Sequence, residues 1–197
     1  MKKIAVTGNI GSGKSWVCEL WKQRFGIPVY DSDSAAKQMY FKPEVREMLV
    51  GRFGDGFYLS DNELNRKLIA DLIFHDEKAQ RDLEGILYPA VFMDFDAWAS
   101  RQNASYVLFE SALIFEKRLE TRFDAVVMVS ASEITRLRRA MLRDRCDEAT
   151  VRARMANQWP EEGKRLLSDF VIWHENDDED GHLIEQITKL HSLFINF

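Results

Sequence analysis

The residues with the clearest chemical signature lie near the start of the chain, where residues 8–15 read GNIGSGKS. This segment matches the pattern G-x-x-x-x-G-K-[ST], in which the backbone N–H groups of a glycine-rich loop surround phosphate oxygens. In such a loop Lys14 reaches the β- and γ-phosphates, and the hydroxyl of Ser15 is a ligand of Mg²⁺. The segment therefore predicts a site for a nucleoside triphosphate.

The reaction must be inferred from other residues, and two carboxylates follow the apolar segment 27–30: Asp31 and Asp33. Phosphoryl transfer to a hydroxyl needs a carboxylate that orients the acceptor and takes its proton. The carboxyl ends of strands border the ligand crevice in open α/β sheets, so we predict that Asp33 is this base. The alternative role for Asp33 is to cap the helix that follows. For Asp31, a capping role and a contact with metal-bound water are equally supported by the sequence.

A third carboxylate, Glu110, ends the apolar run of residues 106–109. This is the position of a Walker B acid, and we predict that Glu110 holds Mg²⁺ through a bound water, because Mg²⁺ usually keeps several waters.

Two arginines, Arg139 and Arg143, are four residues apart and share one face of a predicted helix. On a lid helix they would bind the β- and γ-phosphates as charge develops during transfer. The alternative is a solvated basic face that pairs with Asp144 and Asp147.

The elements that must position these groups follow from the apolar runs. Five short apolar segments read as strands, and helical patterns separate them: residues 3–7, 27–30, 106–109, 124–129 and 170–173. This alternation predicts an α/β fold of the P-loop NTPase type, with three layers and a parallel five-stranded sheet.

The region between the second and third of these strands has no strong strand signal and is dominated by helical periodicity. We therefore predict a nucleotide-binding core of residues 1–35 and 102–197, with a lid at about 139–165. The helical insertion, residues 36–101, is predicted to be the subdomain that binds the acceptor.

Composition excludes several classes of protein. The 197 residues carry 27 Lys and Arg against 32 Asp and Glu, and a net charge of −5 argues against general nucleic-acid binding. The two cysteines have no paired spacing and the four histidines are scattered, so neither a disulfide nor a zinc site is expected. No signal peptide or membrane-spanning run is recognisable. We expect a cytoplasmic enzyme with small-molecule substrates and no membrane partner; a monomer is favoured, although the oligomeric state is not fixed.

The order and spacing of motifs along nearly the whole chain resemble the dephospho-CoA kinase family. The start is similar to the family's TGGIGSGKS, and residues 26–33, GIPVYDSD, are similar to its LGxxVxDAD. The similarity continues in order through Phe53-Gly54, LNRKL (64–68), LYP (87–89), ESALIFE (110–116), RAMLRD (139–144), RMANQ (154–158), Lys164 and SDFVI (168–172).

This resemblance implies ATP-dependent phosphorylation of the ribose 3′-hydroxyl of dephospho-CoA, with Mg²⁺ as cofactor. The residues that it implies for ATP binding are Gly11, Ser12, Gly13, Lys14, Ser15 and Trp16. Those implied for catalysis are Asp33, Lys14, Arg139 and Arg143, and those for the metal are Ser15 and Glu110. The acceptor would contact Asp33, Arg66 and a turn formed by Tyr88 and Pro89.

Several positions depart from the family pattern. Asn9 replaces a glycine, Trp16 a small residue, Tyr88 a histidine, Ala112 a proline and His174 an asparagine. Because asparagine adopts left-handed backbone angles more readily than most residues, we expect Asn9 to tolerate the backbone angle of the glycine that it replaces. None of these changes alters Lys14, Ser15 or Asp33, so catalysis is expected.

Three other functions fit part of the pattern. Another small-molecule or nucleoside monophosphate kinase would use the same parts with a different acceptor pocket. A GTPase-like switch is disfavoured because the chain has no N-K-x-D segment. A P-loop protein without catalytic activity is disfavoured because Lys14, Ser15 and Asp33 are intact.

Overall fold

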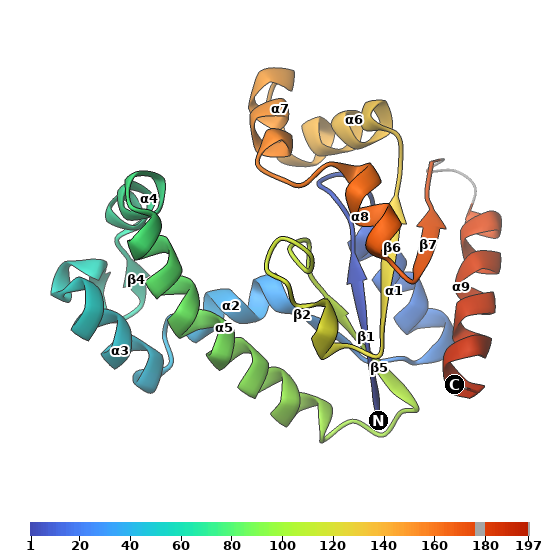
Figure 1. Cartoon of the computed structure of the whole chain (residues 1–197), viewed down its shortest axis with the longest axis horizontal. Coiled ribbons are helices and arrows are strands. Elements are labelled where there is room, and N and C mark those ends of the chain that lie inside the picture. The colour runs from blue at the N-terminus through green and yellow to red at the C-terminus, as the bar shows by residue number, and fades with distance from the viewer. Residues whose placement is uncertain (176–179, 197) are drawn as a thin grey trace. The chain divides into compact units, whose positions relative to one another are not determined.

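In the computed structural model, which describes residues 1–175 and 180–196, the five predicted strands form one parallel sheet (Figure 1). The order across the sheet is β2-β5-β1-β6-β7. The bounds are β1 Lys2–Thr7, β2 Val29–Asp31, β5 Tyr106–Glu110, β6 Ala125–Ser130 and β7 Phe170–Trp173. The predicted parallel five-stranded sheet is thus confirmed, and every residue of β5 and β6 is buried, as expected for strands covered on both faces.

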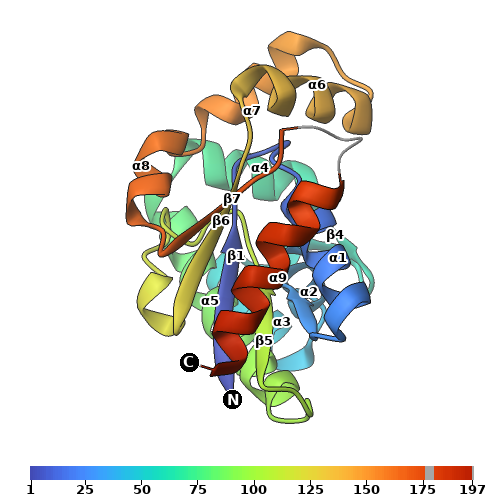
Figure 2. The ribbon, with the colours of Figure 1, turned by 90° about the vertical axis from the view of Figure 1, so that its right-hand side faces the viewer.

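The chain divides into two compact units, one of Met1–Asp31 with Gln102–Phe197 and one of Ser32–Arg101. The first unit contains the sheet and the helices α1 Lys14–Phe25, α6 Glu133–Asp144, α7 Glu148–Ala156, α8 Glu161–Leu167 and α9 Asp180–Asn196. It also contains the short 3₁₀ helix η2 Glu120–Arg122. Helices α1 and α9 lie side by side against the sheet, as Figure 2 shows.

The core of the first unit forms where these two helices cover the sheet. Branched aliphatic side chains dominate the strands, and larger side chains from the helices fill the space above them. The buried members are Ile4, Val6, Val17, Cys18, Trp21, Ile27, Tyr106, Leu108, Ala125, Val127, Val129, Ile172, Leu183, Ile187 and Phe194.

A polar chain crosses this core and joins α1, β5 and α9. The indole nitrogen of Trp21 donates a hydrogen bond to the hydroxyl of Tyr106 (2.6 Å), which lies 2.7 Å from Nδ1 of His191. The imidazole of His191 also stacks on Phe25 at 4.0 Å. Partial burial lowers the pKa of His191, because desolvation penalises the imidazolium.

The lowered pKa of His191 makes stability depend on pH near neutrality. The unfolded chain binds a proton at a pKa of about 6.5, above the folded value, so the free energy of unfolding falls as pH drops below about 6.5. We expect His191→Phe to flatten this dependence, measured as the melting temperature at pH 7.5, 6.5 and 5.5. Parallel curves for the two proteins would show that His191 does not cause the slope.

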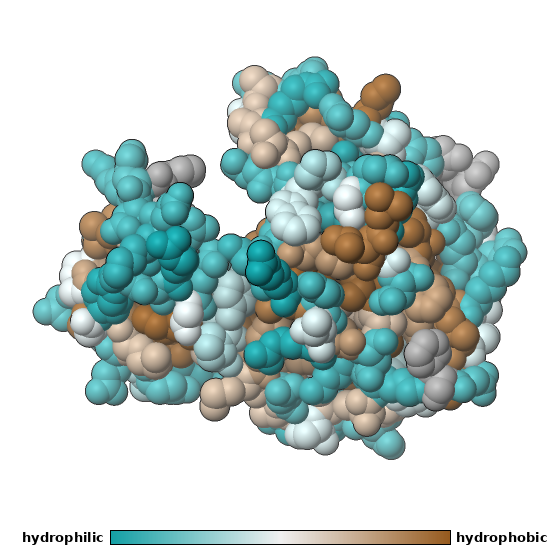
Figure 3. Space-filling model, in the orientation of Figure 1, coloured by the Kyte–Doolittle hydropathy of each residue, from teal (hydrophilic) through white to brown (hydrophobic). Residues whose placement is uncertain are grey.

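Helix α8 is unusual because one of its charged side chains, Lys164, is buried while its two leucines are exposed. The ammonium of Lys164 is fully buried, forms an ion pair with Glu116 and donates to the carbonyl of Ala112 (3.0 Å). Leu166 and Leu167 are 76% and 59% exposed, and Figure 3 shows hydrophobic residues at the surface where α8 lies. The buried ion pair therefore sets the orientation of this short helix.

The second unit is helical with one small hairpin. Its elements are α2 Ser32–Met39, α3 Pro43–Phe53, η1 Asp55–Phe57, β3 Tyr58–Ser60, β4 Glu63–Leu64, α4 Arg66–His75 and α5 Glu77–Ala99. Two side chains fix helix starts: Asn65 accepts the N–H of Leu68, and Asp76 accepts those of Lys78 and Ala79. The unit has its own core, with the buried residues Val45, Leu49, Phe57, Tyr58, Ile69 and Leu83.

The predicted turn at Tyr88 and Pro89 is wrong, because both residues lie inside the 23-residue helix α5. Proline removes one backbone hydrogen bond, to the residue four positions earlier, which here is Gly85. The helix persists because α5 contacts α2, α3 and α4 along its length and buries apolar residues on both sides of the proline. Tertiary packing therefore overrides the local signal for a break.

Candidate nucleotide-binding site

The P-loop, residues 8–15, leads from β1 into α1 and contains two glycines in left-handed conformations. The φ angles of Gly11 and Gly13 are 78° and 88°. A Cβ on Gly11 would lie 2.1 Å from the carbonyl oxygen of Arg136, and one on Gly13 would lie 2.2 Å from Nδ1 of His174. Both positions therefore need glycine for the backbone angle and for space.

Asn9 does not need to tolerate a left-handed backbone angle. Among the described residues other than glycine, only Arg118 and Arg145 have a positive φ, so the backbone of Asn9 is not left-handed. The side chain of Asn9 is 6% exposed, and its amide donates a hydrogen bond to the carbonyl of Trp159 (3.0 Å).

The predicted phosphate-binding lysine, metal-binding serine and strand-end acid lie together. Nζ of Lys14 is 3.1 Å from Oε1 of Glu110, and the hydroxyl of Ser15 donates a hydrogen bond to the same oxygen. The side chains of Lys14 and Glu110 are 15% and 10% exposed. Because β2 and β5 are paired in register, Asp31 ends its strand level with Glu110. Two acids thus mark the carboxyl edge of the sheet beside the P-loop helix.

The oxygen atoms at this edge suit Mg²⁺. Across the described residues, no group of three or more His, Cys, Asp or Glu side chains could hold a metal. Mg²⁺ does not require such a cluster, because it binds one or two protein oxygens and completes its shell with phosphate and water. The adjoining hydroxyl of Ser15 and carboxylate of Glu110 are hard oxygen donors of this kind, so the residues present fit the ion.

Asp33 belongs to the second compact unit, in the first turn of α2, and it follows Asp31 by two residues. The helix begins at Ser32, so Asp31 and not Asp33 immediately precedes it. Asp33 therefore does not occupy the position before the helix, on which the capping alternative was based.

Arg139 lies against the P-loop. Its Nη1 donates to the carbonyl of His174 (2.8 Å) and, at 3.4 Å, to the carbonyl of Ser12. The guanidinium thereby links α6, the end of β7 and the loop that leads into α1.

Arg143 is engaged differently. Its guanidinium forms two hydrogen bonds with the carboxylate of the neighbouring Asp144 (2.8 and 3.0 Å), and Arg154 of α7 binds the same carboxylate (2.6 Å). Hydrogen bonds from the two arginines hold the pKa of Asp144 far below its usual range. This pairing of Arg143 with Asp144 is the one expected if the arginines form a solvated basic face.

The two arginines give a testable pair. We expect Arg139→Lys and Arg143→Lys each to lower kcat, by about tenfold or more, because lysine keeps the charge but loses the planar fork that fits phosphate oxygens. The change in melting temperature should be small. Arg152→Lys, an exposed arginine of α7 paired with Glu133 and Glu148, is the control. Full activity in both variants would restore the interpretation of a solvated face.

Two residues form the wall of the P-loop: sequence reasoning missed Arg136 and noted His174 only as a departure from the family pattern. Arg136 is buried, binds Glu161 (2.7 Å) and places its carbonyl at Gly11, whereas His174 fills the space beside Gly13. The next residue, Glu175, accepts hydrogen bonds from Ser132 and Thr135 at the start of α6, and these lower the pKa of its carboxyl to about 2. The spacing of Arg136 and Arg139 on one helix face was the available signal.

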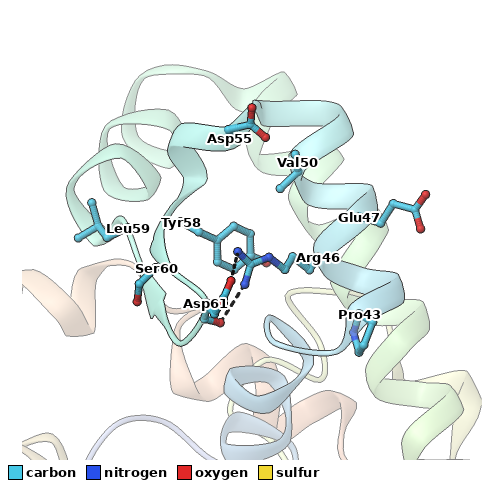
Figure 4. A pocket seen from close by; sticks show the side chains of 9 residues that line it. All are labelled: Pro43, Arg46, Glu47, Val50, Asp55, Tyr58, Leu59, Ser60 and Asp61. Atoms are coloured by element: carbon cyan, nitrogen blue, oxygen red, sulfur yellow. Dashed lines mark hydrogen bonds and ion pairs between the residues drawn. The ribbon is translucent and has the colours of Figure 1, made fainter.

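In the second unit a hollow of about 520 Å³ lies between α3 and the β3–β4 hairpin (Figure 4). Arg46 crosses it, pairs with Asp61 (3.1 Å) and stands 4.4 Å over the ring of Tyr58. Glu47 and Asp55 add two more acids to the lining. With three carboxylates against one guanidinium, this hollow does not suit a pyrophosphate.

The predicted acceptor residues lie elsewhere in this unit. Arg66 is the exposed first residue of α4, Tyr88 is partly buried and Pro89 is exposed on α5, and none of them lines the hollow.

In the part of the chain that the structure describes, none of the helices is long and apolar enough to cross a membrane.

The chain is similar to known proteins in sequence and in structure. A family profile described as dephospho-CoA kinase matches residues 2–180. A dephospho-CoA kinase from Syntrophotalea carbinolica is 37% identical over 189 residues, which cover 93% of this chain and 86% of that relative.

Two solved structures share the fold over almost the whole chain. The protein TT1252 from Thermus thermophilus superposes with a TM-score of 0.84 at 31% identity, covering 98% of this chain and 96% of its own. A shikimate kinase from Bacteroides thetaiotaomicron superposes with a TM-score of 0.56 at 14% identity, covering 98% and 97%. The latter likeness supports the P-loop kinase fold alone.

Proposed function

The chain belongs to the dephospho-CoA kinase family, and from this premise we propose how its residues divide the work of phosphoryl transfer. The protein is an enzyme that phosphorylates dephospho-CoA with ATP, the last step of CoA biosynthesis. The proposal is that the acceptor atom is the ribose 3′-hydroxyl, and that transfer takes place at the P-loop.

The P-loop residues Gly11 to Trp16 bind the nucleotide, with backbone N–H groups and Lys14 directed to its phosphates. The contact of Lys14 and Ser15 with Glu110 is the single observation that best supports this proposal. A Mg²⁺ ion held by Ser15 and Glu110 would supply charge neutralisation at the phosphate oxygens. When phosphates bind, Lys14 exchanges its contact with Glu110 for the transferring group.

Asp33 takes the proton of the acceptor hydroxyl and orients it for in-line attack. Its place, two residues beyond the carboxyl end of β2, supports this role. Arg139 and Arg143 stabilise the charge that develops on the phosphoryl oxygens, and the position of Arg139 beside Ser12 supports its part.

The helical segment of residues 36–101 holds the acceptor, with contacts from Arg66, Tyr88 and Pro89. Its separate hydrophobic core supports an independent binding unit. The enzyme acts as a monomer in the cytoplasm and has no nucleic-acid partner; the net charge of −5 supports the last point.

The substrate assignment is tested by measuring ADP release with dephospho-CoA, AMP, shikimate or no acceptor. We expect turnover with dephospho-CoA to exceed the other three rates by orders of magnitude, and the product to carry the new phosphate on the ribose 3′-oxygen. Preferential phosphorylation of AMP or shikimate would overturn the assignment, and ADP release without any acceptor would indicate an ATPase.

A further inference from the structure

The loop that returns from α7 to α8 contacts the crest of the P-loop directly. The backbone N–H of Ile10 donates to Oε1 of Gln158 (2.8 Å), and the side-chain amide of Asn9 donates to the carbonyl of Trp159 (3.0 Å). Two adjacent residues of the returning loop thus bind two adjacent residues of the P-loop.

The returning loop is itself fixed to the core. The N–H of Trp159 donates to Oε1 of Glu116 (3.2 Å), and the same carboxylate pairs with the fully buried Lys164. Breaking a buried pair leaves an uncompensated charge, so this anchor resists displacement. Gln158 therefore extends from a loop that is anchored to a buried ion pair.

The hydrogen bond of Gln158 constrains the backbone of the P-loop at Ile10. The N–H of Ile10 is therefore bonded within the protein. A second hydrogen bond, from the N–H of Ser12 to the carbonyl of Asn9 (3.0 Å), extends the constraint along the loop. The far side of the loop is held by the backbone of Arg136 and the ring of His174.

We propose that Gln158 is a positioning residue, which holds the first turn of the P-loop in its anion-binding shape and ties it to the returning end of the α6–α7 hairpin. Asn9 supports the same contact from the P-loop. A loop held in this shape before the nucleotide arrives loses less conformational entropy on binding. This role rests on the proposed use of the P-loop for the phosphates of ATP.

Gln158 acts in the free enzyme. Its loss therefore weakens the binding of the substrate and the binding of the transition state by the same factor. Uniform weakening of this kind raises KM and leaves kcat unchanged. For Gln158→Met, which keeps the volume but removes the acceptor, we expect KM for ATP and Kd for ADP to rise roughly five- to tenfold, as for loss of one hydrogen bond. The kcat should stay within about twofold and the Kd of dephospho-CoA should not change.

Hydrogen exchange of the full-length protein tests the contact without turnover. The amide of Ile10 should exchange faster in Gln158→Met than in the unaltered protein. In Gln158→Glu its protection should persist, because the carboxylate is still an acceptor. Gln23→Met removes a solvent-exposed glutamine that binds Glu19 on α1, and it serves as the control with no expected change.

A second variant guards against a folding defect in the first. Asn9→Ala removes the bond to Trp159, and we expect a smaller rise in KM for ATP and in Kd for ADP. A lower melting temperature with unchanged nucleotide affinity, in either variant, would overturn the positioning role. So would unchanged exchange of Ile10 in Gln158→Met. Failure of the unaltered protein to bind ADP would instead contradict the proposed function, so the two failures are distinguishable.

Discussion

Lys14→Ala should abolish phosphoryl transfer, by roughly 10³-fold or more, while the protein stays folded. The ammonium is the one cationic side chain within the P-loop, residues 8–15, so no other group of that loop can follow the charge onto the transferring group. In the structure it is paired with Glu110, which also accepts the hydrogen bond of Ser15 and so keeps a partner in the variant.

The measurement for Lys14 is kcat with dephospho-CoA, alongside the melting temperature and circular dichroism of each protein. Lys22→Ala, an exposed lysine near the end of the same helix, is the matched control and should retain full activity. A folded Lys14→Ala protein with the unaltered rate would falsify the assignment of this loop as the site of transfer.

Asp33→Asn should lower kcat by ~10²–10⁴-fold, because the amide keeps the shape of the side chain but cannot take the acceptor's proton. The affinity for ATP should change little, since the proposed role of Asp33 concerns the acceptor. The two quantities are separated by steady-state kinetics and by titration of ADP binding.

Asp31→Asn is the natural comparison for this second variant, because the two carboxylates are two residues apart and only one can be the base. We expect the change at Asp31 to be the milder one. The opposite order of severity would show that their roles have been exchanged.

The parallel sheet was predictable because buried strands carry continuous apolar runs, and residues 106–109 and 124–129 have few other interpretations. The β3–β4 hairpin was not, because strands of three and two residues are too short to show a period. The wrong prediction of a turn at Pro89 has a related cause. Its effect on the backbone is local, whereas the contacts that keep α5 helical come from α2, α3 and α4.

The residues of the candidate site also fall into those that the sequence predicted and those that it did not. Lys14 and Ser15 were predictable because their spacing within the loop is fixed by phosphate geometry, and Glu110 because it ends a buried strand. Arg136 and Gln158 were not assigned to the site, and His174 was noted only as a departure from the family pattern, since all three approach the P-loop from segments more than 120 residues away along the chain. Their contacts with Gly11, Ile10 and Gly13 depend on how α6, the α7–α8 loop and β7 fold back.

The second unit leaves the sheet after β2 and returns at β5, and these two strands are neighbours in the sheet. Two adjacent parallel strands require some crossover between them, but their pairing places no demand on what the crossover contains. The part of this unit beyond the proposed base Asp33, residues 36–101, can therefore lengthen, shorten or change sequence during evolution without altering the register of the five-stranded sheet. If this unit selects the acceptor as proposed, a lineage can acquire a new substrate by exchanging one continuous stretch of gene, while the phosphate-handling residues stay under separate selection.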